Sequence, residues 1–227
     1  MMKNANRFQR FLLLAVGGVL LSVFVAAIII PKGNDVLWIN GNHNEFSDRF
    51  FTFITYGGDG KIFIPLIIIT LFIRFSYSLA VISAWIGHGM LCSALKRLVF
   101  PTVLRPTGAI DNDLLYFVPG VDVHANYSFP SGHTATAFCF AILFALLIKR
   151  RSVFIVVIAF AMIVAYSRIY LLQHFLIDVA GGAFIGTAIA FVAWYLFENY
   201  GKAEWMGRRL EIQIKRATYK EQRATRV

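Results

Sequence analysis

The chain has 227 residues, of which 58% are hydrophobic and only 15% are charged, and its formal net charge is +10 at pH 7. Soluble domains carry about 25% charged residues, so this composition excludes an ordinary soluble domain and indicates a membrane protein. The positive charges lie outside the apolar runs and accompany no nucleic-acid-reading motif, which favours contacts with anionic lipid over a nucleic-acid partner. The length suits one domain, residues 1–227.

Six apolar segments follow one another along the chain and predict an all-α fold, an integral membrane bundle of six transmembrane helices. About 20 apolar residues cross the hydrocarbon core of a bilayer. The first run meets this length and lacks the cleavage pattern of a signal peptide, so we expect it to be retained. The second run is short and lies between two basic residues, so it crosses the membrane only if their charges snorkel to the surface. The six segments are Phe11–Ile30, Ile62–Ile73, Leu79–Leu95, Thr134–Ile148, Val153–Ser167 and Leu176–Phe197.

Polar connections separate these segments. Pro31–Asp59 contains Asn-Gly, Gly-Gly and Asp-Gly turn signals, and we expect it to be an outer loop. Phe100–Pro130 contains four prolines and is expected to be a second loop. Residues 198–227 form a basic tail, which we expect to rest on an anionic membrane surface.

The basic residues predict the orientation in the membrane. Six crossings put both termini on one side, and the basic residues that flank the crossings there make that side cytoplasmic by the positive-inside rule. These residues are Lys3, Arg7, Arg10, Arg74, Lys149, Arg150, Arg151, Lys202, Arg208, Arg209, Lys215 and Arg216. Alternation then brings the end of the third segment, the start of the fourth, the end of the fifth and the start of the sixth together on the opposite side. Ionisable residues at these ends predict a functional site there.

Two motifs at those ends supply the chemistry for attack on a phosphate ester. One is Pro-Ser-Gly-His at residues 130–133, and the other is Ser-Arg-x5-His-x3-Asp at residues 167–178. His174 and Asp178 are four residues apart, so on a helix they would share a face. Asp178 can accept a hydrogen bond from one imidazole nitrogen of His174, which leaves the other nitrogen free as a nucleophile.

Other residues near these motifs can serve the phosphate group. His133 lies at a predicted helix start and can protonate the leaving oxygen as a general acid. The backbone N–H groups of residues 131–133 would point at an anion, as they do at helix N-termini. Lys96, Arg105 and Arg168 can hold the phosphoryl oxygens, and phosphoryl transfer mainly requires such positioning and charge stabilisation. No Asp/Glu cluster able to hold Mg²⁺ is evident nearby, so we predict neither a metal nor a cofactor.

With these motifs the chain resembles the type 2 phosphatidic acid phosphatase superfamily, which includes bacterial lipid phosphatases and vanadium-dependent haloperoxidases. The second and third parts of the family pattern match residue for residue, and the six-segment layout extends the resemblance to the whole chain. The resemblance implies that His174 forms a phosphohistidine intermediate, that His133 protonates the leaving group and that Asp178 orients His174. It also implies a set of phosphate-binding residues: Lys96, Arg105, Ser131, Gly132 and Arg168.

The first part of the family pattern, Lys-x6-Arg-Pro, is only partly present. Arg105 precedes a proline, but the residue seven positions before it is Leu98. Lys96 and Arg97 both remain candidates for the first phosphate ligand, and an insertion of one or two residues around Phe100-Pro101 would account for the spacing.

The resemblance implies a membrane lipid phosphatase that hydrolyses a phosphomonoester or diphosphate of a lipid without a metal. Lipid A and undecaprenyl diphosphate are the favoured substrates, because an outward-facing site meets those phosphates, and phosphatidylglycerol phosphate and phosphatidic acid are the others. The implied location is a bacterial inner membrane, with cytoplasmic termini and a periplasmic active site. A lipid-to-lipid phosphotransferase and a non-catalytic lipid-binding or transport protein are the alternatives. The expected partners are the lipid substrate and membrane lipids, and the oligomeric state stays open.

Overall fold

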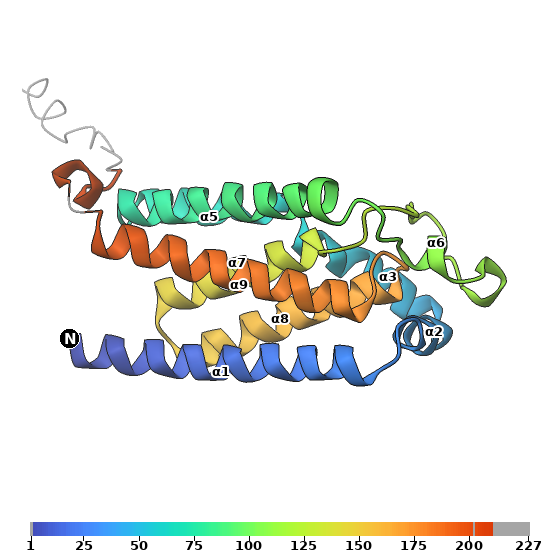
Figure 1. Ribbon diagram of the computed structural model, residues 1–227. Coiled ribbons are helices and arrows are strands. Elements are labelled where there is room, and N and C mark those ends of the chain that lie inside the picture. The colour runs from blue at the N-terminus through green and yellow to red at the C-terminus, as the bar shows by residue number, and fades with distance from the viewer. Residues whose placement is uncertain (1, 202, 211–227) are drawn as a thin grey trace, which may run out of the picture.

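The computed structural model describes residues 2–201 and 203–210, and within these residues it contains helices and connecting turns but no strand. Five long helices run side by side: α1 (Met2–Ile29), α5 (Phe75–Ala94), α7 (Gly132–Ile148), α8 (Arg151–Tyr170) and α9 (Leu176–Asn199) (Figure 1). The short helices α2 (Asn34–Gly41), α3 (Glu45–Ile54) and α6 (Pro106–Ala109) gather at one end of this bundle, and the N-terminus lies at the other (Figure 1). The all-α membrane bundle predicted from the sequence is therefore present.

The helices account for the predicted transmembrane segments unequally. Four stretches of the described residues are long and apolar enough to cross a membrane: Arg7–Ile29, Phe75–Val99, Arg151–Tyr170 and Leu176–Asn199. A fifth crossing is possible if Glu45–Gly58 and Gly60–Leu71, which meet at an angle of 62°, are counted as one. The remaining predicted segment is α7, an apolar helix of 17 residues. Length and hydropathy thus support four or five crossings in the described part of the chain.

The first outer connection differs from the predicted loop. Pro31–Asp59 holds α2, α3 and a 3₁₀ turn, η1 (Thr55–Gly58), and a second turn, η2 (Gly60–Ile62), leads into α4 (Phe63–Leu71). The side chain of Asn44 caps α3 by accepting a hydrogen bond from the backbone N–H of Ser47 at 2.9 Å. The prediction of a loop was wrong. The turn signals lie at helix ends and in short 3₁₀ turns, so they mark where helices end and do not exclude helices between them.

Helix α7 lies at the centre of the bundle and packs closely on α9. A Cβ atom added to Gly182 would lie 2.3 Å from the backbone oxygen of Ser131, and one added to Gly186 would lie 2.1 Å from that of Ala135. Such small residues, four apart on one helix face, let two backbones approach each other in a membrane protein. This contact joins the start of α7 to the first half of α9, and both carry predicted site residues.

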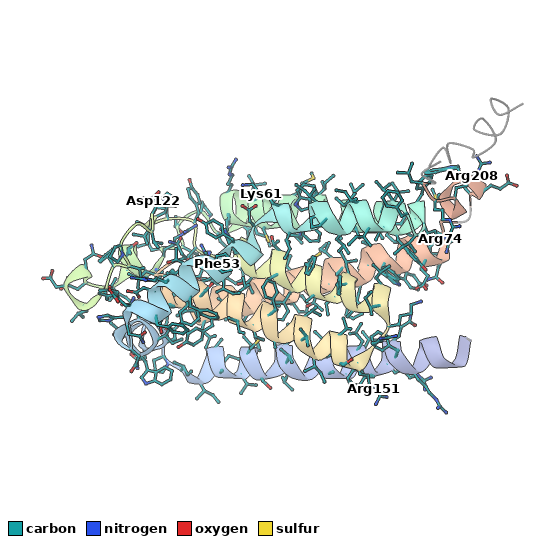
Figure 2. All side chains as sticks on the ribbon, turned by 180° about the vertical axis from the view of Figure 1, so that it is seen from behind. Phe53, Lys61, Arg74, Asp122, Arg151 and Arg208 are labelled. Carbon is teal, nitrogen blue, oxygen red and sulfur yellow. The ribbon has the colours of Figure 1, made fainter. Side chains whose placement is uncertain are left out.

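Three of the arginines predicted to be cytoplasmic lie at one end of the bundle, which is called the basic end. Arg74, Arg151 and Arg208 lie at the end that holds the N-terminus, whereas Asp122 lies at the opposite end (Figure 2). The segment before residue 211 is tied to this basic end, because the backbone N–H of Phe75 donates to the oxygen of Arg208 at 2.9 Å. Much of the predicted basic tail, including Lys202, Lys215 and Arg216, lies outside the described residues, as does the side chain of Lys3.

Candidate active site

A polar cavity of about 480 Å³ lies at the end of the bundle opposite the N-terminus. Its walls come from α3 and η1, from the turn η3 (Leu95–Val99) after α5, from the connection before α7 and the start of α7, and from the end of α8 and the turn that follows it. Six of the eight predicted site residues line it: Lys96, Arg105, Gly132, His133, Arg168 and His174. The fold therefore brings residues from distant parts of the sequence to one cavity. They lie at the segment ends that the alternation of crossings predicts to share one side.

The other two predicted residues, Ser131 and Asp178, lie behind the cavity wall and are buried. Ser131 caps α7: its Oγ accepts hydrogen bonds from Thr134 Oγ1 at 2.9 Å and from the Thr134 backbone N–H at 3.4 Å. Its own backbone N–H donates to the backbone oxygen of Asp178 at 2.9 Å. The side chain of Ser131 thus holds the start of α7 in place, while the backbone of Gly132 faces the cavity.

His174 and Asp178 are neighbours, but not through a shared helix face as predicted. His174 precedes α9, and Asp178 lies in its first turn. Asp178 Oδ2 accepts a hydrogen bond from the backbone N–H of Phe175 at 2.9 Å, which folds the chain back at the helix start. His174 Nδ1 lies 3.7 Å from Asp178 Oδ2, longer than a direct hydrogen bond. The two side chains are close, as predicted, but the predicted cause was wrong. Capping at the N-terminus of α9, and not a shared helix face, brings the side chains of His174 and Asp178 together.

Ser128 completes this group and was not predicted. Its Oγ donates to Asp178 Oδ2 at 2.5 Å and lies 3.5 Å from His174 Nδ1. Ser128, His174 and Asp178 are all at least 98% buried. No sequence pattern indicated Ser128, because its partners are 46 and 50 residues away along the chain.

Three cationic side chains face the same cavity: Lys96, Arg105 and Arg168. Arg168 is 7% exposed, and its Nη1 bonds with the hydroxyl of Thr55 in η1 at 2.5 Å. Its buried Nε has no hydrogen-bond partner among the described residues. An unsatisfied buried donor on a charged group is costly, so this N–H is available to an anion that enters the cavity.

The geometry distinguishes the two candidates for the first basic ligand. Lys96 lines the cavity, whereas Arg97 is exposed and does not. Both lie in η3 (Leu95–Val99), a π-helical turn closed by a hydrogen bond from the N–H of Phe100 to the oxygen of Leu95 at 2.8 Å. A π turn accommodates one more residue than an α turn. It therefore accounts for one of the two residues by which the spacing between Lys96 and Arg105 exceeds the family pattern.

The cavity has the electrostatics of an anion site. Burial first, and then the positive charges of Arg168, Lys96 and Arg105, hold the pKa of His174 well below its usual value. His174 is therefore a neutral imidazole at neutral pH, with an unprotonated nitrogen able to attack.

The chain is similar to several known proteins. The sequence profile of the PAP2 superfamily matches residues 51–202. The chain is 30% identical to a lipid A 4'-phosphatase of Bacteroides thetaiotaomicron over 165 residues, 66% of this chain and 70% of that protein. It is 29% identical to phosphatidylglycerophosphatase B of Bacillus subtilis over 204 residues, 85% of this chain and 93% of that protein. The crystal structure of Aquifex aeolicus LpxE superposes with a TM-score of 0.62 at 28% identity, over 70% of this chain and 92% of that one.

Proposed function

The chain belongs to the PAP2 superfamily, and from that premise we propose that it is a membrane lipid phosphatase that works through a phosphohistidine intermediate without a metal. The observation that carries the proposal is His174, a neutral imidazole on the wall of a cationic cavity, backed by a buried carboxylate. A nucleophile, an orienting base and anion-binding groups in one cavity are the components that phosphoryl transfer requires.

The first step forms a bond from His174 to phosphorus. His174 Nδ1 faces Asp178 Oδ2 and Ser128 Oγ, so Nδ1 carries the proton and Nε2 attacks. The bond between phosphorus and the lipid oxygen breaks, and His133, which takes up a proton as the phosphate anion enters the cavity, gives that proton to the leaving oxygen. Lys96, Arg105 and Arg168 neutralise the charge on the phosphoryl oxygens.

The second step returns the enzyme to its starting state. A water molecule attacks the phosphohistidine, His133 accepts a proton from that water, and the bond between phosphorus and Nε2 breaks. Inorganic phosphate leaves, and His174 is again neutral. No step needs an oxidant or a reductant, and water is the one co-substrate.

We place residues 1–227 in one domain that crosses the inner membrane six times, with the catalytic residues between Lys96 and Asp178. In this arrangement the bent pair of helices and the 17-residue α7 each serve as one crossing. The basic end of the bundle, with Arg74, Arg151 and Arg208, faces the cytoplasm, and the cavity faces the periplasm (Figure 2).

The substrate we favour is a lipid A phosphate or undecaprenyl diphosphate. A periplasmic cavity meets lipids whose phosphates are exposed on that side, and one similar protein is named as a lipid A 4'-phosphatase. Phosphatidylglycerol phosphate is the next candidate because another similar protein is a phosphatidylglycerophosphatase. Phosphatidic acid is the fourth candidate substrate.

Phosphate release by the purified protein in detergent, with EDTA present, tests the proposal against these four lipids. We expect release from at least one lipid, abolished in His174→Ala and retained in His43→Ala, which removes an exposed histidine outside the cavity. Full release by His174→Ala would contradict the phosphohistidine route, and release that EDTA abolishes would contradict metal independence. A newly phosphorylated lipid in place of free phosphate would identify a phosphotransferase.

A further inference from the structure

Gln173 lies directly before His174, and the oxygen and the nitrogen of its carboxamide both form hydrogen bonds. It is 4% exposed and lines the cavity. Its Oε1 accepts a hydrogen bond from Arg105 Nη1 at 2.7 Å, and its Nε2 donates to the backbone oxygen of Asp122 at 2.8 Å. A guanidinium can only donate and a carbonyl oxygen can only accept, so the two partners determine the orientation of the amide.

These bonds orient the guanidinium of Arg105. Its Nε donates to the backbone oxygen of Asn126 at 3.0 Å, and its Nη1 donates to Gln173. A guanidinium has five N–H groups. Two are used in these bonds, so three remain for the oxygens of an anion in the cavity.

Hydrogen bonds also fix the backbone around Gln173. The backbone N–H groups of Gln173 and His174 both donate to the oxygen of Arg168, at 2.9 and 3.1 Å. Leu172, one residue earlier, has a φ of 57°. Gln173 therefore joins the turn that carries His174, the guanidinium of Arg105 and the connection that covers the cavity at Asp122.

The charge of the acceptor at position 173 determines how much of the positive charge of Arg105 is available to a phosphate. A carboxylate at position 173 would pair with Arg105 and repel a phosphate, whereas a neutral amide orients the guanidinium and leaves its positive charge to the substrate. We propose that Gln173 is a positioning residue that holds the guanidinium of Arg105 ready for the phosphoryl group and links it to the connection over the cavity. This proposal rests on the proposed function, in which Arg105 binds phosphate.

The test compares Gln173→Met, which keeps the length of the side chain, with Gln173→Glu, which keeps its shape and adds a charge. Gln9→Met is the matched control, because Gln9 lies outside the cavity, on α1. We expect the inhibition constant of inorganic phosphate and the KM for the lipid to rise about tenfold in Gln173→Met and further in Gln173→Glu. The kcat should change less than about threefold, because the nucleophile and its carboxylate stay in place.

A double-mutant cycle with Arg105→Gln separates positioning from a structural role. If Gln173 acts through Arg105, then Gln173→Met should have almost no further effect on phosphate inhibition once Arg105 is replaced. An undiminished effect in the Arg105→Gln background would overturn the proposal, as would wild-type phosphate inhibition in both Gln173 variants. If Gln173→Met does not fold, the near-isosteric Gln173→Glu decides the question.

Thermal melting in detergent with increasing inorganic phosphate measures binding without catalysis, since a ligand raises the stability of the state that binds it. If the wild type hydrolyses no lipid but is stabilised by phosphate, the proposed function fails, and the Gln173 variants still test the positioning role. An absence of phosphate-dependent stabilisation in the wild type would overturn the positioning role as well.

Discussion

At the scale of single residues, the site depends on how one buried carboxylate is held. Asp178 Oδ2 accepts hydrogen bonds from Ser128 Oγ and from the Phe175 backbone N–H, and it lies 3.7 Å from His174 Nδ1. Asp178 Oδ1 has no partner among the described residues. Two donors on one oxygen restrict the rotation of the carboxylate, and this keeps that oxygen beside the imidazole.

We expect Ser128→Ala to lower kcat about 10- to 100-fold with little change in KM, because a hydrogen bond to a charged group contributes about 1.5–3 kcal/mol. Steady-state phosphate release measures this. Ser76→Ala is the matched control, since Ser76 is also fully buried but its Oγ has no partner among the described residues. A Ser128→Ala enzyme with wild-type kcat would show that Asp178 is oriented without the hydroxyl.

The neutral state of His174 predicts how stability depends on pH. Burial and the adjacent cations hold the pKa of His174 in the folded protein well below 6.5, its value in an unfolded chain. The unfolded chain therefore binds an extra proton between the two values. The contribution of neutral His174 is fully present above about pH 6.5 and is lost as the pH falls toward the folded-state pKa.

Melting temperatures measured from pH 8 to pH 5 test this prediction. Below about pH 6.5 the wild type should lose stability more steeply than His174→Gln, which has no titrating group at this position. Above that pH the two curves should run parallel. Parallel curves over the whole range would mean that the folded protein does not depress the pKa of His174.

At the scale of elements, the contact between α7 and α9 sets the geometry of the site. Helix α7 carries His133 at its start and α9 carries Asp178 in its first turn, and the glycines at 182 and 186 let the two backbones touch. A side chain at either glycine would meet backbone atoms, which cannot move aside without shifting a helix.

We therefore expect Gly186→Ala to lower the stability by about 1–3 kcal/mol, the usual cost of overpacking a core, and to reduce activity. Gly89→Ala is the control on α5, because a Cβ there meets nothing within 4 Å. The control should keep its activity and its stability, or gain up to about 1 kcal/mol from the higher helix propensity of alanine. Thermal melting and phosphate release of the two variants, measured side by side, give the comparison, and an unaffected Gly186→Ala would contradict the close contact.

At the scale of the whole molecule, the cavity and the arginines at 74, 151 and 208 lie at opposite ends of the bundle (Figures 1 and 2). The cavity is built from the connections at one end, and the arginines that predict the cytoplasmic side lie at the other. In the orientation that we propose, a lipid phosphate reaches the cavity from one side of the membrane only.

Cysteine labelling tests this orientation. Cys92 and Cys139 are both buried, so the background labelling should be low. In intact spheroplasts, a membrane-impermeant maleimide should label Asn112→Cys at the cavity end, but should label Arg150→Cys only after the membrane is permeabilised. Both positions are exposed. The reverse pattern would place the site on the cytoplasmic side.

The sequence by itself determined the family of the protein and most of the predicted residues that the structure places at the cavity. A run of apolar residues needs no partner to indicate a membrane helix, and a motif such as residues 167–178 places His174 and Asp178 close together within one local segment. Composition and motif spacing are local properties, so they could be read before any fold was known.

Only the tertiary structure decided which other side chains contact those residues. Ser128 reaches Asp178 across 50 residues, Gln173 reaches Arg105 across 68, and Arg168 reaches Thr55 across 113. The structure also brought Lys96, not Arg97, to the cavity wall, through a π turn that no spacing rule predicts. Contacts of this kind depend on how the helices pack, and the periodicity of a single segment carries no information about which distant segment will lie beside it.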